Sequence, residues 1–206
     1  MTTSSEKSNP LKIVIGLATR GNDICASLVN FLLRNSHVNG TRFIYKACAW
    51  SAPLVQELVF QEAANLDPDY LLMVDSDVTP PFDALEEMIK REKDLISAPI
   101  WHYNAGTGEI HLNAHKEFCK RIRSTDFKGI EKIKTTSFGC LLISQKVLRK
   151  FKELKESFVN WSPFLGEEFK PQSSDVIFFG KCEKRFLSQK CDQVVEGKRT
   201  GIQKFL

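Results

Sequence analysis

The sequence predicts one α/β domain in which a mostly parallel, Rossmann-like central sheet is flanked by helices and followed by a smaller mixed half. Within residues 11–98, apolar runs typical of buried strands alternate four times with segments of helical spacing, and the connections are short. One of these runs ends in two acidic residues, at the edge where open α/β sheets bind their ligands. The chain has 206 residues, which is enough for one full hydrophobic core.

Each element of the first half is indicated by its apolar pattern. Continuous apolar runs predict strands, and apolar residues three or four apart, such as Leu28, Phe31 and Leu32, predict helices. Strands joined by helical crossovers run parallel, so these elements predict a parallel sheet covered on both faces. The expected strands are Lys12–Leu17, Arg42–Cys48, Tyr70–Val74 and Asp94–Ala98, and the expected helices are Asp23–Arg34, Leu54–Asn65 and Phe82–Arg91.

The second half has a different character. Pro99–Lys134 is polar and basic, and we expect it to be irregular. Thr135–Ser144 begins with small residues and becomes apolar, which predicts a buried strand, and Gln145–Phe151 has helical spacing. We expect the sheet to depart from all-parallel order at the strand that begins near Ser137. Ser173–Asp175 opens a further apolar helix.

Composition and charge limit the class of protein. Apolar residues make up 42% and charged residues 26% of the chain, and no apolar run reaches the ~18 residues of a membrane span. Six cysteines without a C-x-x-C pair fit a reducing compartment, so we expect a cytoplasmic protein without a transmembrane segment and with a disordered tail over residues 1–10.

The net charge of +4 is concentrated in residues 116–134 and 181–206. These segments suit a phosphate-bearing ligand or the surface of an anionic membrane, or form an ordinary solvated face; no nucleic-acid-binding module accompanies them.

Asp75 and Asp77 are the candidate metal ligands. Carboxylate oxygens suit Mg²⁺ or Mn²⁺, which share the rest of their coordination shell with water and substrate phosphates. The alternative is a solvated turn that caps the next helix. Asp67-Pro68-Asp69 has the same D-x-D pattern, and there we expect a turn before the strand.

The sequence contains two other patterns that could bind a ligand. His111, His115 and Cys119 are spaced i, i+4, i+8, so on a helix they would share a face and could bind zinc, although no fourth ligand is evident. The turn Thr19–Asn22 is short and contains glycine, which suits an edge that faces a nucleotide. It lacks both G-x-G-x-x-G and G-x-x-x-x-G-K, so dinucleotide-binding and P-loop sites are poor interpretations.

Taken in order, these motifs resemble glycosyltransferases of the GT-A fold, particularly the large inverting group called family 2. The resemblance covers nearly all of residues 11–204. It rests on four elements: Leu17-Ala18-Thr19 at the end of the first strand, Leu72–Asp77, the segment Thr136–Ile143, and Ser174-Asp175 before an apolar helix. In that family the last pair is usually Glu-Asp, so Ser174 departs from the pattern while Asp175 keeps it.

The resemblance implies a nucleotide-sugar donor, UDP- or GDP-linked, a glycan, lipid or protein acceptor, and a Mn²⁺ or Mg²⁺ cofactor. It divides the chain into a nucleotide-binding half, residues 11–98, and an acceptor-side half, residues 99–206. By the resemblance, Thr19, Arg20, Gln56, Asp75 and Ser76 would bind the nucleotide, Asp75 and Asp77 the metal, Ser137, Gly139 and Cys140 the donor sugar, and Trp101 and His102 the acceptor. For Trp101 and His102 the alternative is packing within a loop or simple exposure to solvent.

Two residues of the second half have implied chemical roles. Asp175 would accept the proton of the acceptor hydroxyl, since a carboxylate can act as a general base; the alternative is a helix cap. Many metal-dependent relatives carry a histidine in a Gly-His-x-Gly-like turn near the C-terminus. Here the corresponding stretch is Glu196–Gly201 with Lys198, which cannot ligate a metal while protonated but could contact the diphosphate.

Three other functions compete with this interpretation. Asp75-Ser76-Asp77-Val78-Thr79 also matches the D-x-D-x-T opening of haloacid dehalogenase-type phosphatases, in which Asp75 would be the nucleophile. Those enzymes usually begin with this strand and need a later lysine and a downstream acidic pair, whereas here three elements precede the motif and no later Asp-Asp or Gly-Asp-x-x-x-Asp is present. A nucleotidyltransferase could use the same two carboxylates. Ser174 and Lys198 favour a non-catalytic nucleotide- or glycan-binding module.

Overall fold

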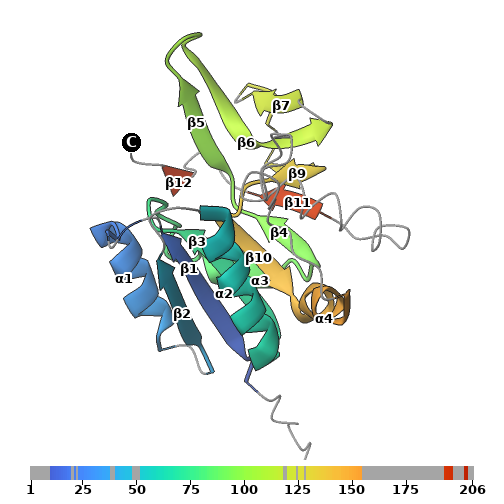
Figure 1. Cartoon of the computed structure of the whole chain (residues 1–206). Helices are drawn as coiled ribbons and strands as arrows, with labels where there is room; N and C mark the ends of the chain where they lie inside the picture. The colour runs from blue at the N-terminus through green and yellow to red at the C-terminus, as the bar shows by residue number, and fades with distance from the viewer. Residues whose placement is uncertain are drawn as a thin grey trace, which may run out of the picture.

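A computed structural model describes residues 10–19, 21, 23–37, 40–47, 52–117, 120–123, 125–127, 129–154, 193–196 and 202–203 (Figure 1). Strands and helices alternate through the first half, as the apolar pattern predicts. The elements in chain order are β1 Ile13–Thr19, α1 Ala26–Asn35, β2 Arg42–Ala47, α2 Ala52–Leu66, β3 Tyr70–Asp75, α3 Ala84–Ile89, β4 Leu95–Ser97, β5 Ile100–Asn104, β6 Glu109–Glu117, β7 Lys120–Arg123, β8 Ile130–Lys132, β9 Thr135–Thr136, β10 Cys140–Ser144, α4 Gln145–Leu154, β11 Gln193–Glu196 and β12 Ile202–Gln203.

The central sheet has seven strands in the order β2-β1-β3-β10-β4-β11-β8. Pairing is parallel between β1 and β2, β1 and β3, and β4 and β11, whereas β10 runs antiparallel to both β3 and β4. β8 is antiparallel to β11. The sheet is therefore mixed: five strands, β2, β1, β3, β4 and β11, run in one direction, as predicted for a mostly parallel sheet, but three of the six pairings are antiparallel. The expected change of direction at the strand that follows Ser137 is confirmed.

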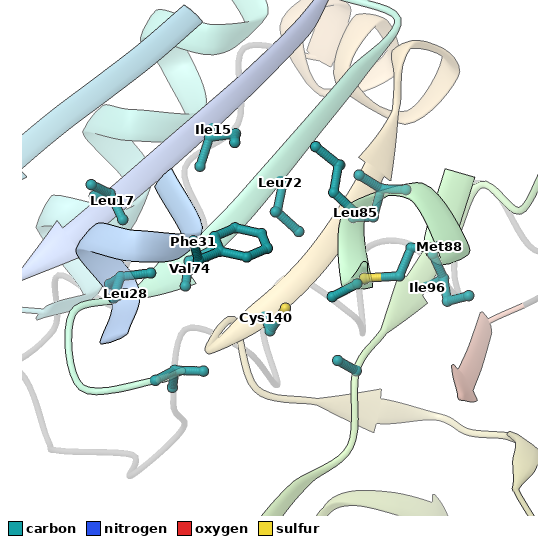
Figure 2. Close-up of a cluster of buried hydrophobic side chains, with 14 of the residues drawn as sticks. Ile15, Leu17, Leu28, Phe31, Leu72, Val74, Leu85, Met88, Ile96 and Cys140 are labelled. Carbon is teal, nitrogen blue, oxygen red and sulfur yellow. The ribbon is translucent and has the colours of Figure 1, made fainter. Parts of the chain in front are cut away.

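Two hydrophobic layers enclose this sheet. On one face, α1 and α3 pack on β1, β3 and β10 through a cluster that includes Phe31, Leu72 and Met88 (Figure 2). On the other face, α2 and α4 pack through Val59, Met73 and other apolar residues. Because both faces are covered, β1 and the interior of β3 are buried along their length, as continuous apolar runs require.

One glycine fixes how closely α2 approaches the sheet. A Cβ atom on Gly16 of β1 would overlap Cγ1 of Val59 in α2 and lie 3.3 Å from Cδ1 of Leu71 in β3. The missing side chain therefore lets the helix pack directly on the strand.

The second half is not irregular, and that expectation is wrong. β12, β5, β6 and β7 form a second sheet, in which β9 also pairs with β6, above the central sheet in Figure 1. Along β6, Leu112 and Ala114 are buried whereas His111 and His115 are half-buried. This alternation has the period of a strand with one buried face, which needs few apolar residues, so the low apolar content of the segment does not indicate irregular structure.

The amino end of the central sheet is closed by the other D-x-D motif. Asp67 has a left-handed backbone, with φ of 48°, and its carboxylate accepts two hydrogen bonds from Arg149 of α4, at 2.8 and 2.7 Å. The main-chain nitrogen of Lys12 donates to Asp69 at 2.7 Å. This motif is a turn, as predicted.

None of the helices in the described part has the length and apolar character that crossing a bilayer requires.

Candidate functional site

The candidate site lies at the carboxyl ends of β1 and β3, which are neighbours in the sheet. Ala18 is the register partner of Asp75, so Thr19 and Ser76 follow side by side. The Ser76 hydroxyl donates to Thr19 Oγ1 at 3.1 Å, and the main-chain nitrogen of Gly21 donates to the same oxygen at 3.2 Å. Thr19 is only 5% exposed, so the two strand ends are joined by a buried polar contact. Thr19 and Ser76 thus lie at this edge of the sheet, as predicted from the sequence.

Asp75 is held on both sides. Its main-chain nitrogen donates to the carbonyl of Gly139 at 3.1 Å, and its Oδ1 accepts a long contact of 3.4 Å from Nε2 of Gln56. Gln56 belongs to α2 and is 7% exposed, so the amide is fixed by burial. The three elements β3, α2 and the segment before β10 thus converge on one carboxylate, which is half-buried.

The segment before β10 leaves room beside that carboxylate because residue 139 is glycine. A Cβ atom there would lie 3.3 Å from Asp75 Oδ2, 3.4 Å from Ser137 Oγ and 2.5 Å from Ile100 Cδ1. The Ser137 hydroxyl is buried and has no hydrogen-bond partner within the described residues. A buried hydroxyl without a partner is costly, so a ligand group or water that accepts or donates at this point would stabilise it.

Cys140, the first residue of β10, does not offer a reactive group to the site. Its side chain is fully buried in the layer shared with α1 and α3 (Figure 2). Burial, together with the negative charge of Asp75, raises the pKa of the thiol to about 12, so it stays protonated at neutral pH.

The start of α1 holds the turn that carries the second aspartate, a feature that sequence reasoning missed. The main-chain nitrogen of Cys25 donates to the carbonyl of Ser76 at 3.2 Å, and the hydroxyls of Ser27 and Thr79 are 2.6 Å apart. Burial opposes ionisation of the Cys25 thiol, but hydrogen bonds from Ser27 and Thr79 outweigh it and lower the pKa. Asp77 is half-buried within this turn. Sequence alone gave no signal, because the contacts join segments about fifty residues apart.

The two residues expected at the acceptor lie on opposite faces of β5. Trp101 packs edge-on against Phe127, with ring centroids 5.5 Å apart, beside the small core of the second sheet. His102 is exposed on the other face. Of the remaining predicted site residues, Arg20, Asp175 and Lys198 lie outside the described residues.

The zinc interpretation is wrong in its geometry. His111 and His115 lie on a strand, not a helix, so the four-residue spacing separates them by roughly 13 Å. Cys119 lies outside the described residues. Within the described ranges, no group of three or more His, Cys, Asp or Glu side chains could hold a metal ion.

Comparison with known proteins gives a fold-level relationship. No family model matches the sequence, and no curated protein matches it. Among solved structures, A197 from STIV aligns with a TM-score of 0.58 at 14% identity, over 90% of this chain and 81% of that one. The glycosyltransferase TarS of S. aureus, residues 1–349, aligns with a TM-score of 0.51 at 11% identity, over 94% of this chain. The chain spans 60% of that structure's length. The fold is glycosyltransferase-like.

In this glycosyltransferase-like fold, the donor atoms at the sheet edge fit a divalent cation only in part. Asp75 and Asp77 supply two carboxylates on one turn, and the unpartnered hydroxyl of Ser137 is a further oxygen beside Asp75. Mg²⁺ and Mn²⁺ are commonly held by one or two carboxylates with the rest of the shell from water and substrate phosphates. The residues present therefore fit such an ion when a phosphate ligand accompanies it.

Proposed function

We propose that the protein is a glycosyltransferase that moves a sugar from a nucleoside-diphosphate sugar, UDP- or GDP-linked, to an acceptor hydroxyl with inversion. The observation that carries the proposal is that three features meet at Asp75 within a glycosyltransferase-like fold: the buried Gln56, the space left by Gly139, and the Ser137 hydroxyl, which has no hydrogen-bond partner among the described residues. Such a half-buried carboxylate among fixed polar groups is suited to binding a charged, polyhydroxylated ligand.

Each residue of the edge would have a distinct task. Thr19, Ser76 and Gln56 would hydrogen-bond the nucleoside, and the space above Gly139, with the Ser137 hydroxyl, would receive the donor sugar. Asp75 and Asp77 would hold Mn²⁺ or Mg²⁺. Such an ion, when bound, neutralises charge on the diphosphate leaving group.

Three further assignments concern the acceptor and the diphosphate. Asp175 would accept the proton of the acceptor hydroxyl, which becomes a competent nucleophile only as that proton leaves. Lys198 would contact the diphosphate as a point charge. His102 faces solvent on β5 and would contact the acceptor, whereas Trp101 would support β5 from the opposite face.

Nucleotide binding measured by calorimetry, with and without Mn²⁺, tests the metal assignment. Asp77→Asn keeps the size of the side chain but removes its charge, so Mn²⁺-dependent affinity for UDP or GDP should fall by about ten-fold or more. Asp83→Asn is the matched control, because Asp83 is exposed at the start of α3 and its side chain makes no capping hydrogen bond. Equal loss in both variants, or no Mn²⁺-dependent binding in the wild type, contradicts the proposal.

Product formation tests the catalytic part. Asp175→Asn should leave nucleotide binding intact and lower the rate of transfer roughly 10²-fold. Nucleotide binding without transfer to any acceptor by the wild type would favour a non-catalytic binding module instead, the function to which Ser174 and Lys198 point in the sequence.

A further inference from the structure

One face of the second sheet gathers most of the protein's histidines. Along β6, Leu112 and Ala114 are 0% and 1% exposed and point into the small core, so the alternate residues lie on the opposite face. Ile122 of β7 is buried on the core side in the same way, which places its two neighbours on that opposite face. We call it the imidazole face; its members are His102, Asn104, Glu109, His111, Asn113, His115, Arg121 and Arg123.

Side chains pair across the three strands of this face. His102 of β5 is the register partner of His111 of β6, and His111 is the partner of Arg123 of β7. His115 and Arg121 form a second pair. Neighbouring strands are about 4.8 Å apart, so the row His102–His111–Arg123 extends about 10 Å, the dimension of a sugar with one substituent.

The face is rich in donors and poor in acids. Its described side chains include three of the four histidines of the chain and two arginines, against one carboxylate, Glu109, whose Oε2 lies 3.2 Å from His111 Nε2. Arg121 and Arg123 are exposed, and neither forms an ion pair with a carboxylate of the described part. The other ring nitrogen of His111, Nδ1, is buried and has no partner there. Two exposed guanidinium groups beside imidazoles favour an anion, because guanidinium binds phosphate and carboxylate in bidentate fashion.

The imidazole face begins at the candidate site. Ile100, the first residue of β5, lies on this side of the strand, and its Cδ1 is 2.5 Å from the position of a Cβ on Gly139. His102 is two residues further along, about 7 Å away. From β6, the carbonyl of Asn113 accepts a hydrogen bond from the Ser137 nitrogen at 3.3 Å. A molecule that lies on this face therefore has one end near Asp75 and the donor-sugar space.

We propose that the imidazole face binds the acceptor and that the bound part of the acceptor carries an anionic group, either a phosphate or a carboxylate on a polyhydroxylated molecule. The inference rests on the glycosyltransferase function proposed above, which supplies a reason for a second substrate at this place. The anionic group lies over His102, His111 and Arg123, and the hydroxyl to be glycosylated lies toward Gly139.

Small probes can test the face without knowledge of the natural acceptor. Amide resonances of the full chain are followed by NMR during titration with glycerol 3-phosphate and with glucuronate, with glycerol and glucose as the uncharged matches. We expect saturable shifts in β5, β6 and β7 with at least one charged probe and with neither uncharged match. A response to glycerol 3-phosphate alone indicates a phosphate-bearing acceptor, and a response to glucuronate alone indicates a uronic acid.

Charge-removing variants show whether the arginines cause the binding. Arg121→Gln with Arg123→Gln should weaken binding of the charged probe about five-fold or more, because the charge-assisted hydrogen bonds of Arg123 and the neighbouring positive charge of Arg121 are both lost. Arg42→Gln is the matched control, since Arg42 is an exposed strand arginine of the central sheet. Unchanged affinity in the double variant, an equal loss in the control, or shifts confined to residues around Asp75 would overturn the assignment.

A nucleotide titration on the same sample separates this inference from the proposed function. UDP or GDP with Mn²⁺ should shift residues near Thr19 and Asp75 in the wild type and equally in the double variant. If nucleotide produces no shift while the charged probe still binds β5–β7, the glycosyltransferase proposal fails and with it the identity of the anion as an acceptor. If nucleotide binds normally and no charged probe shifts the imidazole face, only the anionic acceptor is refuted.

Discussion

Gly139→Ala, which adds one methyl group, should have two distinguishable effects at the candidate site: it should destabilise the packing and it should weaken ligand binding. The Cβ of Gly139→Ala would lie 2.5 Å from Ile100 Cδ1, whereas carbon atoms pack best at 3.5–4.0 Å, so the isoleucine methyl must move by about 1 Å. Ile100 is 4% exposed and cannot turn into solvent. Overpacking of this kind lowers the free energy of unfolding by about 1–3 kcal/mol. About 0.4–1 kcal/mol of this is offset because alanine has less conformational freedom than glycine in the unfolded chain.

A second substitution removes the clashing atom and nothing else. Ile100→Val deletes Cδ1 and by itself should cost about 0.5–1.5 kcal/mol. In the double variant the free energy of unfolding, measured by urea denaturation, should exceed the additive expectation by about 0.5 kcal/mol or more. Nucleotide-sugar binding, measured by calorimetry, should be weakened in Gly139→Ala and remain weakened in the double variant. The new methyl still lies 3.3 Å from Asp75 Oδ2 and 3.4 Å from Ser137 Oγ, where the donor sugar is expected.

Two outcomes would refute this reasoning. Additive stability changes would mean that the Gly139–Ile100 contact does not govern the packing. Binding restored by Ile100→Val would mean that the alanine acted through displaced packing, and that the space above residue 139 is not part of the site.

Three other results are expected. Gly16→Ala should destabilise the protein by about 3 kcal/mol or more in urea, because its Cβ overlaps the stiff Val59 side chain; a change below about 0.5 kcal/mol would refute the close approach of α2. Burial and the charge of Arg121 lower the pKa of His115 in the folded protein. The free energy of unfolding should therefore fall as the pH drops through about 6.5, the pKa of histidine in the unfolded chain. By NMR, Arg121→Gln should move that pKa upward, and no movement contradicts the pairing. Cys140 should resist iodoacetamide at pH 8 until the protein unfolds, as peptide mass spectrometry can check.

The first half could be predicted closely because its signals are local. β1 and β3 are continuous apolar runs, and their strand ends carry the polar residues that meet in the structure, Thr19, Asp75 and Ser76. The ends of helices were predicted less accurately: α1 begins at Ala26, three residues after the expected start at Asp23. The sequence has no strong capping signal there, since Cys25 makes no side-chain capping bond.

The second half was harder to predict because its strands are stabilised by distant partners. Ile110-His111-Leu112-Asn113-Ala114-His115 alternates as a strand should, but the two histidines also fit a helical spacing, and the pairing with β5 that decides between them is not a local property. The contact between Ile100 and the Gly139 position was likewise invisible, since it joins segments about forty residues apart. Arg20, Asp175 and Lys198 stay predictions.

The position of β10 has a consequence for how the chain must fold during synthesis. β3 and β4 follow each other along the chain, yet β10, which ends at Ser144, fills the space between them. At about 5–20 residues per second, a ribosome needs on the order of 2–10 s to extend the chain from β4 to the end of β10, and the exit tunnel adds to the delay. For that interval the edges of β3 and β4 have no partner, and apolar residues such as Leu72 and Ile96 lack their cover. Residues 11–98 therefore cannot complete their sheet alone, and this part of the nascent chain is where a chaperone would be expected to bind.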